Sequence, residues 1–214
     1  THLIFNKDSY LIVQGKLIVS GTSDDPVIME STEGFWKGLY VWNAEERSYL
    51  SNLEIKNLNA LEDDLLKLTG GINFYKADVD IKNVLIENVK AEDAINFVHS
   101  DYKIDSLKVK NTSSDALDSD FSDGTIENSY FTDIAGDALD FSGSTSDISN
   151  VRILRTGDKG ISVGEESFVN IKNTYIEKTS IGVTSKDASE VVMLNTIVKD
   201  FTAYGVMSFT KKDF

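Results

Sequence analysis

A repeat of about 22 residues constrains the fold of this chain more than any other feature of its sequence. Five segments share one pattern, with starts 23, 22, 22 and 23 residues apart: IKNVLIENV from Ile81, IDSLKVKNT from Ile104, IENSYFTDI from Ile126, ISNVRILRT from Ile148 and IKNTYIEKT from Ile171. A looser copy starts at Val192. An earlier copy at Leu50 stands 31 residues before Ile81, which predicts an insertion in the run NALEDDLLKLTGG. A fixed period of this length is typical of a solenoid.

A second family of segments follows the same step along the chain. It reads AINFV from Ala94, ALDSD from Ala116, ALDFS from Ala138 and GISVG from Gly160, with IGVTS from Ile181 as a looser match. Apolar residues alternate within these segments, as at Ile95 and Phe97, which indicates short strands with inward apolar side chains. Because one coil cannot bury this face alone, the copies should stack about 4.8 Å apart. The sequence therefore predicts an all-β parallel solenoid with about 22 residues per coil.

We expect one β-helix domain over residues 1–214. Irregular coils are expected over 1–49, regular coils over 50–205 with the insertion near 58–71, and a C-terminal end over 206–214. The sequence indicates no capping helix at either end, and a bare end coil offers unpaired strand edges. We therefore expect a piece of a longer protein, or end coils that pair with another chain or another copy.

The third position of the first family forms a column of mostly asparagine residues: Asn52, Asn83, Ser106, Asn128, Asn150 and Asn173. Asparagine tolerates the left-handed backbone that a sharp bend requires. Stacked amides can also hydrogen-bond from one coil to the next. We interpret this column as structural rather than as a binding site.

These patterns resemble the pectin-lyase-like superfamily across nearly the whole chain, which implies a right-handed, single-stranded parallel β-helix. LIVQGKLIVSGTSDDPVIMES followed by FWKGLYV is similar to the opening coils of secreted bacterial β-helix proteins. SDALDSDFSDGTIENSYF, GDALDFSGS and GDKGISVGEES resemble solenoid modules of secreted bacterial proteins that also carry a spore-coat-H-type kinase-like domain. The resemblance implies an extracellular or cell-surface location. It supplies no catalytic set, since the Gly-His-Gly and Arg-Ile-Lys of polygalacturonases are missing from GISVGEES and IGVTSKD.

Composition narrows the possible partners. The net charge is −14, which disfavours nucleic acid as a partner and suits divalent cations or neutral ligands. The chain has no cysteine, so thiol catalysis and cysteine-bound metals are excluded. The sequence also contains no run that approaches the roughly 20 apolar residues of a membrane span.

An acidic column is the first candidate site. Alignment of the second family places Asp118 beside Asp140, with Asp120 two residues further on the same face. Three carboxylates held close together repel one another unless a cation lies between them, and oxygen-rich clusters suit Ca²⁺. The alternative is a solvated face on a very acidic protein. Asp118, Asp120 and Asp140 are therefore candidate Ca²⁺ ligands.

A second column consists of Asp93, Asp115 and Asp137, with Lys159 next in line. Each of these residues comes just before a strand, where aspartate accepts backbone N–H groups in turns. Lys159 is expected to pair with Asp137. The alternative is chemistry beside the metal candidate, with Lys159, Arg155 and Asp137 as the candidate catalytic residues.

Aromatic residues supply two candidate glycan-binding surfaces. Tyr40 and Trp42 share one face of a strand. The fifth position of the first family forms the second surface, a column of Leu85, Lys108, Tyr130, Arg152 and Tyr175. Cross-coil stacking, with Arg152 between Tyr130 and Tyr175 as a cation–π pair, is the structural alternative. Candidate ligand-binding residues are therefore Tyr40, Trp42, Tyr130, Arg152 and Tyr175.

Three functions remain open at this point. The first is a non-catalytic extracellular module that binds polysaccharide or spaces other domains of a secreted protein. The second is a Ca²⁺-dependent polysaccharide lyase or a related carbohydrate-active enzyme. The third is a structural element that assembles through its exposed end coils.

Overall fold

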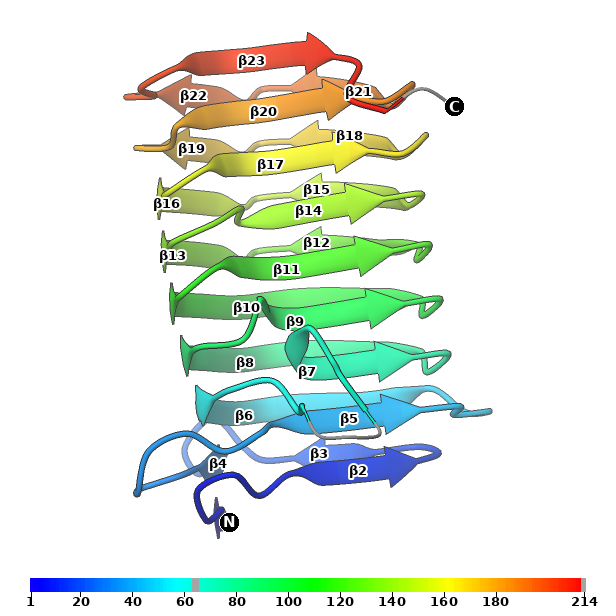
Figure 1. Ribbon diagram of the computed structural model, residues 1–214, viewed down its shortest axis with the longest axis vertical. Helices are drawn as coiled ribbons and strands as arrows, with labels where there is room; N and C mark the ends of the chain where they lie inside the picture. Colours follow the sequence, from blue (N-terminus) through cyan, green and yellow to red (C-terminus); the bar gives the residue numbers. More distant parts are fainter. Residues whose placement is uncertain (63–65, 213–214) are drawn as a thin grey trace.

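The computed structural model describes residues 1–62 and 66–212, and in this part of the chain all regular structure is β-strand. The chain winds through about nine turns of about 23 residues each, stacked along one long axis (Figure 1). Every strand pairing between coils is parallel, for example Ile81 with Ile104 and Ile104 with Ile126. The predicted all-β parallel solenoid is confirmed. No helix in the described ranges is long and apolar enough to cross a membrane.

Two sheets line the solenoid. The nine-stranded sheet contains, in spatial order, β2 (Leu11–Gln14), β5 (Leu39–Trp42), β7 (Gly70–Tyr75), β9 (Asp93–Val98), β11 (Asp115–Asp120), β14 (Leu139–Ser142), β17 (Lys159–Gly164), β20 (Ile181–Lys186) and β23 (Tyr204–Phe209). The main path of the fourteen-stranded sheet is β1 (His2–Ile4), β4 (Val27–Glu30), β6 (Ser48–Leu58), β8 (Val79–Val89), β10 (Tyr102–Thr112), β12 (Gly124–Glu127), β15 (Thr145–Ser149), β18 (Phe168–Lys172) and β21 (Glu190–Leu194). Its remaining strands are β3 (Ile18–Ser20), β13 (Tyr130–Ile134), β16 (Arg152–Thr156), β19 (Tyr175–Glu177) and β22 (Ile197–Lys199).

The fourteen-stranded sheet bends at the predicted asparagine column. Each residue of this column has a left-handed backbone, with φ between 47° and 65°: Asn52, Asn83, Ser106, Asn128, Asn150, Asn173 and Asn195. Amides bond across coils, from Asn83 Nδ2 to Asn52 Oδ1 at 2.7 Å and from Asn150 Nδ2 to Asn128 Oδ1 at 3.2 Å. Because the sheet bends there, each coil has three faces rather than two.

The other two corners also use left-handed residues. One corner carries a second amide ladder, in which Asn88 Nδ2 donates to Asn57 Oδ1 at 3.1 Å and Asn111 Nδ2 donates to Asn88 Oδ1 at 2.6 Å. The corner that follows the nine-stranded sheet carries Asn43, Lys76, His99, Phe121 and Gly143, with φ between 48° and 60°. These columns fix the three corners of the coil.

Strand register corrects the two looser copies by one residue each. Ile171 pairs with Met193, so the last copy of the first family starts there and not at Val192. Ile161 pairs with Val183, so the last copy of the second family starts at Gly182 and not at Ile181. The weak apolar pattern of these end coils leaves the register to backbone pairing, and Asn195 then continues the asparagine column.

Alternating apolar residues fill the interior as predicted. Ile95, Phe97, Leu139 and Phe141 are essentially fully buried. A buried serine column complements this core, with each hydroxyl oxygen accepting a backbone N–H from the preceding coil: Ser100 accepts from Ala77 at 3.0 Å, Ser122 from Ser100 at 2.9 Å, Ser144 from Ser122 at 3.1 Å and Ser167 from Ser144 at 3.0 Å. Serine hydroxyls therefore accept the backbone N–H groups at this corner, where the hydrogen bonds between strands end.

The predicted insertion lies between β6 and β7. Its described parts pass in front of the nine-stranded sheet near β5 and β7 (Figure 1), with one antiparallel bridge between Glu62 and Lys67. In the next coil, the same connection from Val89 to Asp93 takes only a few residues. The extra length covers part of an otherwise open sheet face.

Replacing Asn83 tests the corner geometry. Asn83→Ala places a β-carbon without a compensating amide at φ 51° and removes the bond to Asn52, so we expect the free energy of unfolding to fall by about 1–2 kcal/mol. Asn83→Gly keeps the backbone freedom and should cost less. Urea unfolding of both variants measures the difference. Equal losses would contradict a backbone role for this column.

Candidate functional site

The insertion lines one side of a cavity on the outer face of the nine-stranded sheet. Its volume is about 290 Å³, and it is lined by Tyr40, Lys67, Leu68, Thr69, Asn73, Phe74, Tyr75, Asn96, Val98 and Asp120. The lining comes from β5, β7, β9 and β11, which present these side chains in register, Tyr40 beside Asn73 and Asn73 beside Asn96. Aromatic, amide and carboxylate groups thus meet in one recess.

Aromatic side chains form the end of this recess nearest the N-terminus. The rings of Tyr40 and Trp42 lie 6.3 Å apart between centroids, with 20° between their planes. A second cavity of about 230 Å³ is lined by Ile12, Tyr40, Trp42 and Leu66. Because Tyr40 lines both cavities, the predicted Tyr40–Trp42 pair lies between an apolar cavity and a second one whose lining also includes amide and carboxylate groups.

Amide groups occupy the middle of the recess. Asn96 Nδ2 donates to Asp93 Oδ2 and Asp118 Oδ2, both at 3.2 Å, and lies 3.3 Å from Thr69 Oγ1 of the insertion. Asn73 holds the first residue of its own strand, since its side chain bonds both the N–H and the carbonyl of Gly70. Asn96 therefore ties the insertion to two carboxylates of the sheet.

Carboxylates crowd the sheet beyond Asn96. Asp118 pairs in register with Asp140, as predicted, whereas Asp120 pairs with Ser142. Burial raises the pKa of Asp118 to about 9, and the nearby charges of Asp93 and Asp120 add to the effect. Burial also raises the pKa of Asp93 to about 7, against the hydrogen bonds from Thr69 and Asn96. In the folded protein, Asp118 therefore carries a proton near neutral pH.

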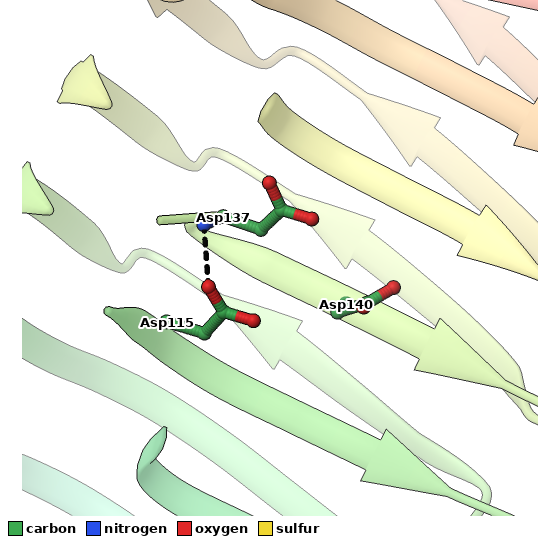
Figure 2. Close-up of side chains that lie close together, drawn as sticks. All are labelled: Asp115, Asp137 and Asp140. Carbon is green, nitrogen blue, oxygen red and sulfur yellow. Dashed lines mark hydrogen bonds between the residues drawn. The ribbon is translucent and has the colours of Figure 1, made fainter. Parts of the chain in front are cut away.

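Asp115, Asp137 and Asp140 form the tightest acidic group in the described residues. Each side chain offers one oxygen, and the three oxygens lie within 4.8 Å of one another (Figure 2). Asp115 Oδ1 accepts the backbone N–H of Asp137 at 2.8 Å, drawn as the dashed line in Figure 2. Of the predicted metal ligands, only Asp140 belongs to this group. Asp118 and Asp120 lie outside it.

Asp115 and Asp137 bond from coil to coil, whereas Asp93, the first member of the predicted column, accepts from Asn96 of its own strand. Asp137 Oδ1 accepts the N–H of Lys159 at 2.8 Å, which repeats the bond from Asp137 to Asp115. The predicted pair also forms, with Lys159 Nζ at 3.2 Å from Asp137 Oδ2. Burial raises the pKa of Asp137 to about 7 despite this cation. Asp115 and Asp137 serve the backbone of the next coil rather than their own turn.

Lys159 and Arg155 are both held as cations. Burial favours loss of the Lys159 proton, but Asp158 and Asp137 outweigh it, so the pKa of Lys159 is raised. Arg155 bonds Asp133 at 2.6 Å and Thr132 at 2.7 Å, and its bond to Asp133 raises the pKa of its guanidinium. The structure thus gives both cations ion-pair partners. It places Arg155 at the corner with Asp133, away from the group in Figure 2.

Lys186 is a cation of this face that sequence reasoning missed. Its ammonium lies 3.9 Å from Asp140 Oδ1, an oxygen that accepts no hydrogen bond within the described residues. Gly164 makes this reach possible, because a β-carbon there would lie 2.5 Å from Lys186 Cε. The only signal in the sequence was that a lysine occupies the last position of β20.

The remaining predicted ligand-binding residues lie on a different face. Tyr130, Arg152 and Tyr175 pair in register across β13, β16 and β19 of the fourteen-stranded sheet. The Arg152 guanidinium lies 5.1 Å from the Tyr175 ring centroid, which matches the structural alternative for that pair. This column and the Tyr40–Trp42 pair cannot contribute to one recess, because they belong to different sheets.

The raised carboxylate pKa values predict a pH dependence of stability. Asp118, Asp93 and Asp137 bind protons in the folded protein at pH values where the unfolded chain has lost them. The free energy of unfolding should therefore be highest below about pH 4 for these groups, and fall by at least about 1 kcal/mol as pH rises toward 9.

Thermal unfolding between about pH 5 and pH 9 measures this slope. Asp118→Asn, which mimics the protonated side chain, should flatten the slope, whereas Asp24→Asn at an exposed site should leave it unchanged. A stability that rises over this range would contradict the assignment.

The comparison with known protein families agrees with the parallel solenoid. Among curated proteins, none matches this chain. The chain is similar to solved structures of the catalytic domain of a GH87 alpha-1,3-glucanase in complex with nigerose, one of them unmodified and two of them single-residue variants. Identity is 10%, with TM-scores of 0.40 to 0.42. The match covers 99% of this chain but 63% of that domain, so the chain spans less than two thirds of its length. Residues 70–213 match the family described as right handed beta helix region, and the chain belongs to that family.

Proposed function

We propose that this chain is a non-catalytic glycan-binding β-solenoid of a secreted or cell-surface protein, and that it binds glycan in the recess beneath the insertion. The observation that carries the proposal is the recess itself, in which Tyr40 and Trp42 adjoin Asn73, Asn96 and Asp120. Small-molecule sites characteristically combine aromatic walls with a few placed polar groups. A sugar matches that mixture, since it has apolar ring faces and hydroxyl groups around its rim.

Charge on this face favours a glycan without acidic groups. Asp120 lines the recess, Asp93 flanks it through its hydrogen bond from Asn96, and the whole chain carries a net charge of −14. A uronate or sulfate would meet carboxylates with only Lys67 as a cation in the described lining. Uncharged sugar hydroxyls, by contrast, can donate to the half-buried Asp120 without charge repulsion.

The state of Lys159 and Arg155 supports binding rather than lyase chemistry. A lyase needs a base that accepts a proton, and both cations have pKa values raised by carboxylate partners. The similarity of GDALDFSGS and GDKGISVGEES to solenoid modules that accompany a kinase-like domain fits an accessory role, in which the module binds glycan or spaces other domains.

Removing Trp42 tests the recess. Trp42→Ala deletes one wall of the aromatic junction, so we expect the Kd for a neutral polysaccharide to rise at least about tenfold. Affinity electrophoresis against xylan, mannan, β-glucan and polygalacturonate, followed by calorimetry, measures binding. Tyr49→Ala, at an exposed ring of the other sheet, is the matched control. Tight binding to polygalacturonate alone, or no binding to any neutral polymer, would contradict the proposal.

Calcium binding at Asp115, Asp137 and Asp140 is a second candidate function. Two observations favour it besides the 4.8 Å grouping. Among the residues that the structure describes, none hydrogen-bonds the buried Asp140 Oδ1, and none bonds the hydroxyl of Ser162, the fully buried register partner of Asp140. Carboxylate and hydroxyl oxygens suit Ca²⁺, and water would complete its six to eight ligands. Lys159 competes with the cation for Asp137, and Lys186, 3.9 Å from Asp140 Oδ1, competes for Asp140.

A calcium titration tests this candidate. At ten times its Kd, Ca²⁺ should raise the free energy of unfolding by about 1.4 kcal/mol, with a larger effect at alkaline pH because the carboxylates must lose their protons. Chelator should reverse the gain and Asp140→Asn should abolish it. Glu33→Gln, at an exposed site, should keep it. Identical melting curves with Ca²⁺ and with chelator would exclude the site.

A further inference from the structure

A row of aromatic rings, here called the ladder, extends from the recess along the edge of the nine-stranded sheet. Tyr75 lines the recess and lies beside Trp42 in register. The Tyr75 ring meets His99 edge-on, with centroids 6.3 Å apart, and His99 stacks on Phe121 at 5.4 Å with 23° between the planes. The three rings stand on three successive coils, so the ladder runs parallel to the solenoid axis. It is continuous with the recess through Tyr75.

The backbone conformation of Phe121 is unfavourable for this residue type. Its φ is 48°, a left-handed conformation that is a rare outlier for a bulky side chain. The same corner column carries Asn43 and Gly143, residue types that tolerate this backbone, and also Lys76 and His99. The Phe121 side chain is also 56% exposed, so burial does not compensate for the strain. Local strain of this kind is concentrated at functional sites.

Gly143 in the next coil leaves room for the ring. A β-carbon on Gly143 would lie 2.6 Å from Phe121 Cδ1 and 2.8 Å from Cε1, closer than any real contact. Phe121 is thus exposed despite its strained backbone, and its neighbour Gly143 has no side chain. Together these two features keep aromatic surface open to solvent at the end of the ladder.

We propose that Tyr75, His99 and Phe121 form a second saccharide subsite, which extends the recess so that the protein binds an internal stretch of an uncharged glycan chain. The inference rests on the proposed function of the recess. From the coil of Trp42 to that of Phe121 there are three steps of about 4.8 Å, or roughly 14 Å in all. A single sugar cannot reach both ends, whereas a chain lying along the axis contacts both the recess and the ladder. Asp120, which neighbours the ladder, again disfavours acidic sugars.

Chain length separates the two sites. We expect a hexasaccharide to bind at least about tenfold more tightly than the disaccharide of the same series, because only the longer ligand reaches the ladder. Cello-, laminari-, xylo- and manno-oligosaccharides of two and six units serve as probes, with Kd measured by calorimetry. Phe121→Asn should remove the advantage of the hexasaccharide while the disaccharide Kd stays within about twofold. Phe121→Tyr should retain the advantage, and Tyr49→Ala should leave both Kd values unchanged.

Thermal unfolding distinguishes a binding role of Phe121 from a purely structural one. Asparagine suits the left-handed backbone, so Phe121→Asn should keep or raise the melting temperature. A lowered melting temperature with an unchanged hexasaccharide Kd would overturn the subsite. Equal affinity for both lengths would also overturn it, while the proposed function of the recess would stand. Failure of every series to bind at either length would overturn the proposed function and the subsite together.

Discussion

Parallel backbone pairing between coils decides where every other group of this protein stands. Neighbouring coils lie about 4.8 Å apart, and partners such as Ile81, Ile104 and Ile126 follow one another at steps of 22 or 23 residues. A residue type repeated at that step becomes a column on one face. Left-handed residues at three corners hold the step constant. The recess, the acidic groups and the aromatic ladder are all consequences of this register, modified only where the insertion interrupts it.

Features that repeat with the coil were predictable from the sequence. The inward residues Ile95 and Phe97 and the bend at Asn83 follow from spacing and residue type alone. The end coils were placed one residue off, because their apolar pattern is weak and only backbone pairing sets Met193 opposite Ile171. The path of the insertion was not predictable, since it has no repeat to compare with and its position depends on contacts such as Thr69 with Asn96.

The candidate site was only partly predictable for a similar reason. Register placed Asp118 beside Asp140 correctly. Which oxygens converge depends on side-chain direction, and Asp115 and Asp137 turn toward Asp140 while they bond the backbone of the next coil. The β11 coil has two unfavourable features within four residues: the half-buried carboxyl group of Asp118, whose pKa is raised to about 9, and the left-handed backbone of Phe121. Such departures from local preference are expected where a surface serves binding.

We propose that glycan binds the outer face of the nine-stranded sheet beneath the insertion. Hydrogen–deuterium exchange with and without a bound neutral hexasaccharide tests it most directly, because the amides of the three faces are reported separately. If glycan binds there, exchange should slow over residues 66–75 and 93–99 and stay unchanged over 130–134 and 152–156. Protection confined to the latter ranges would instead place the glycan on the Tyr130–Arg152–Tyr175 face.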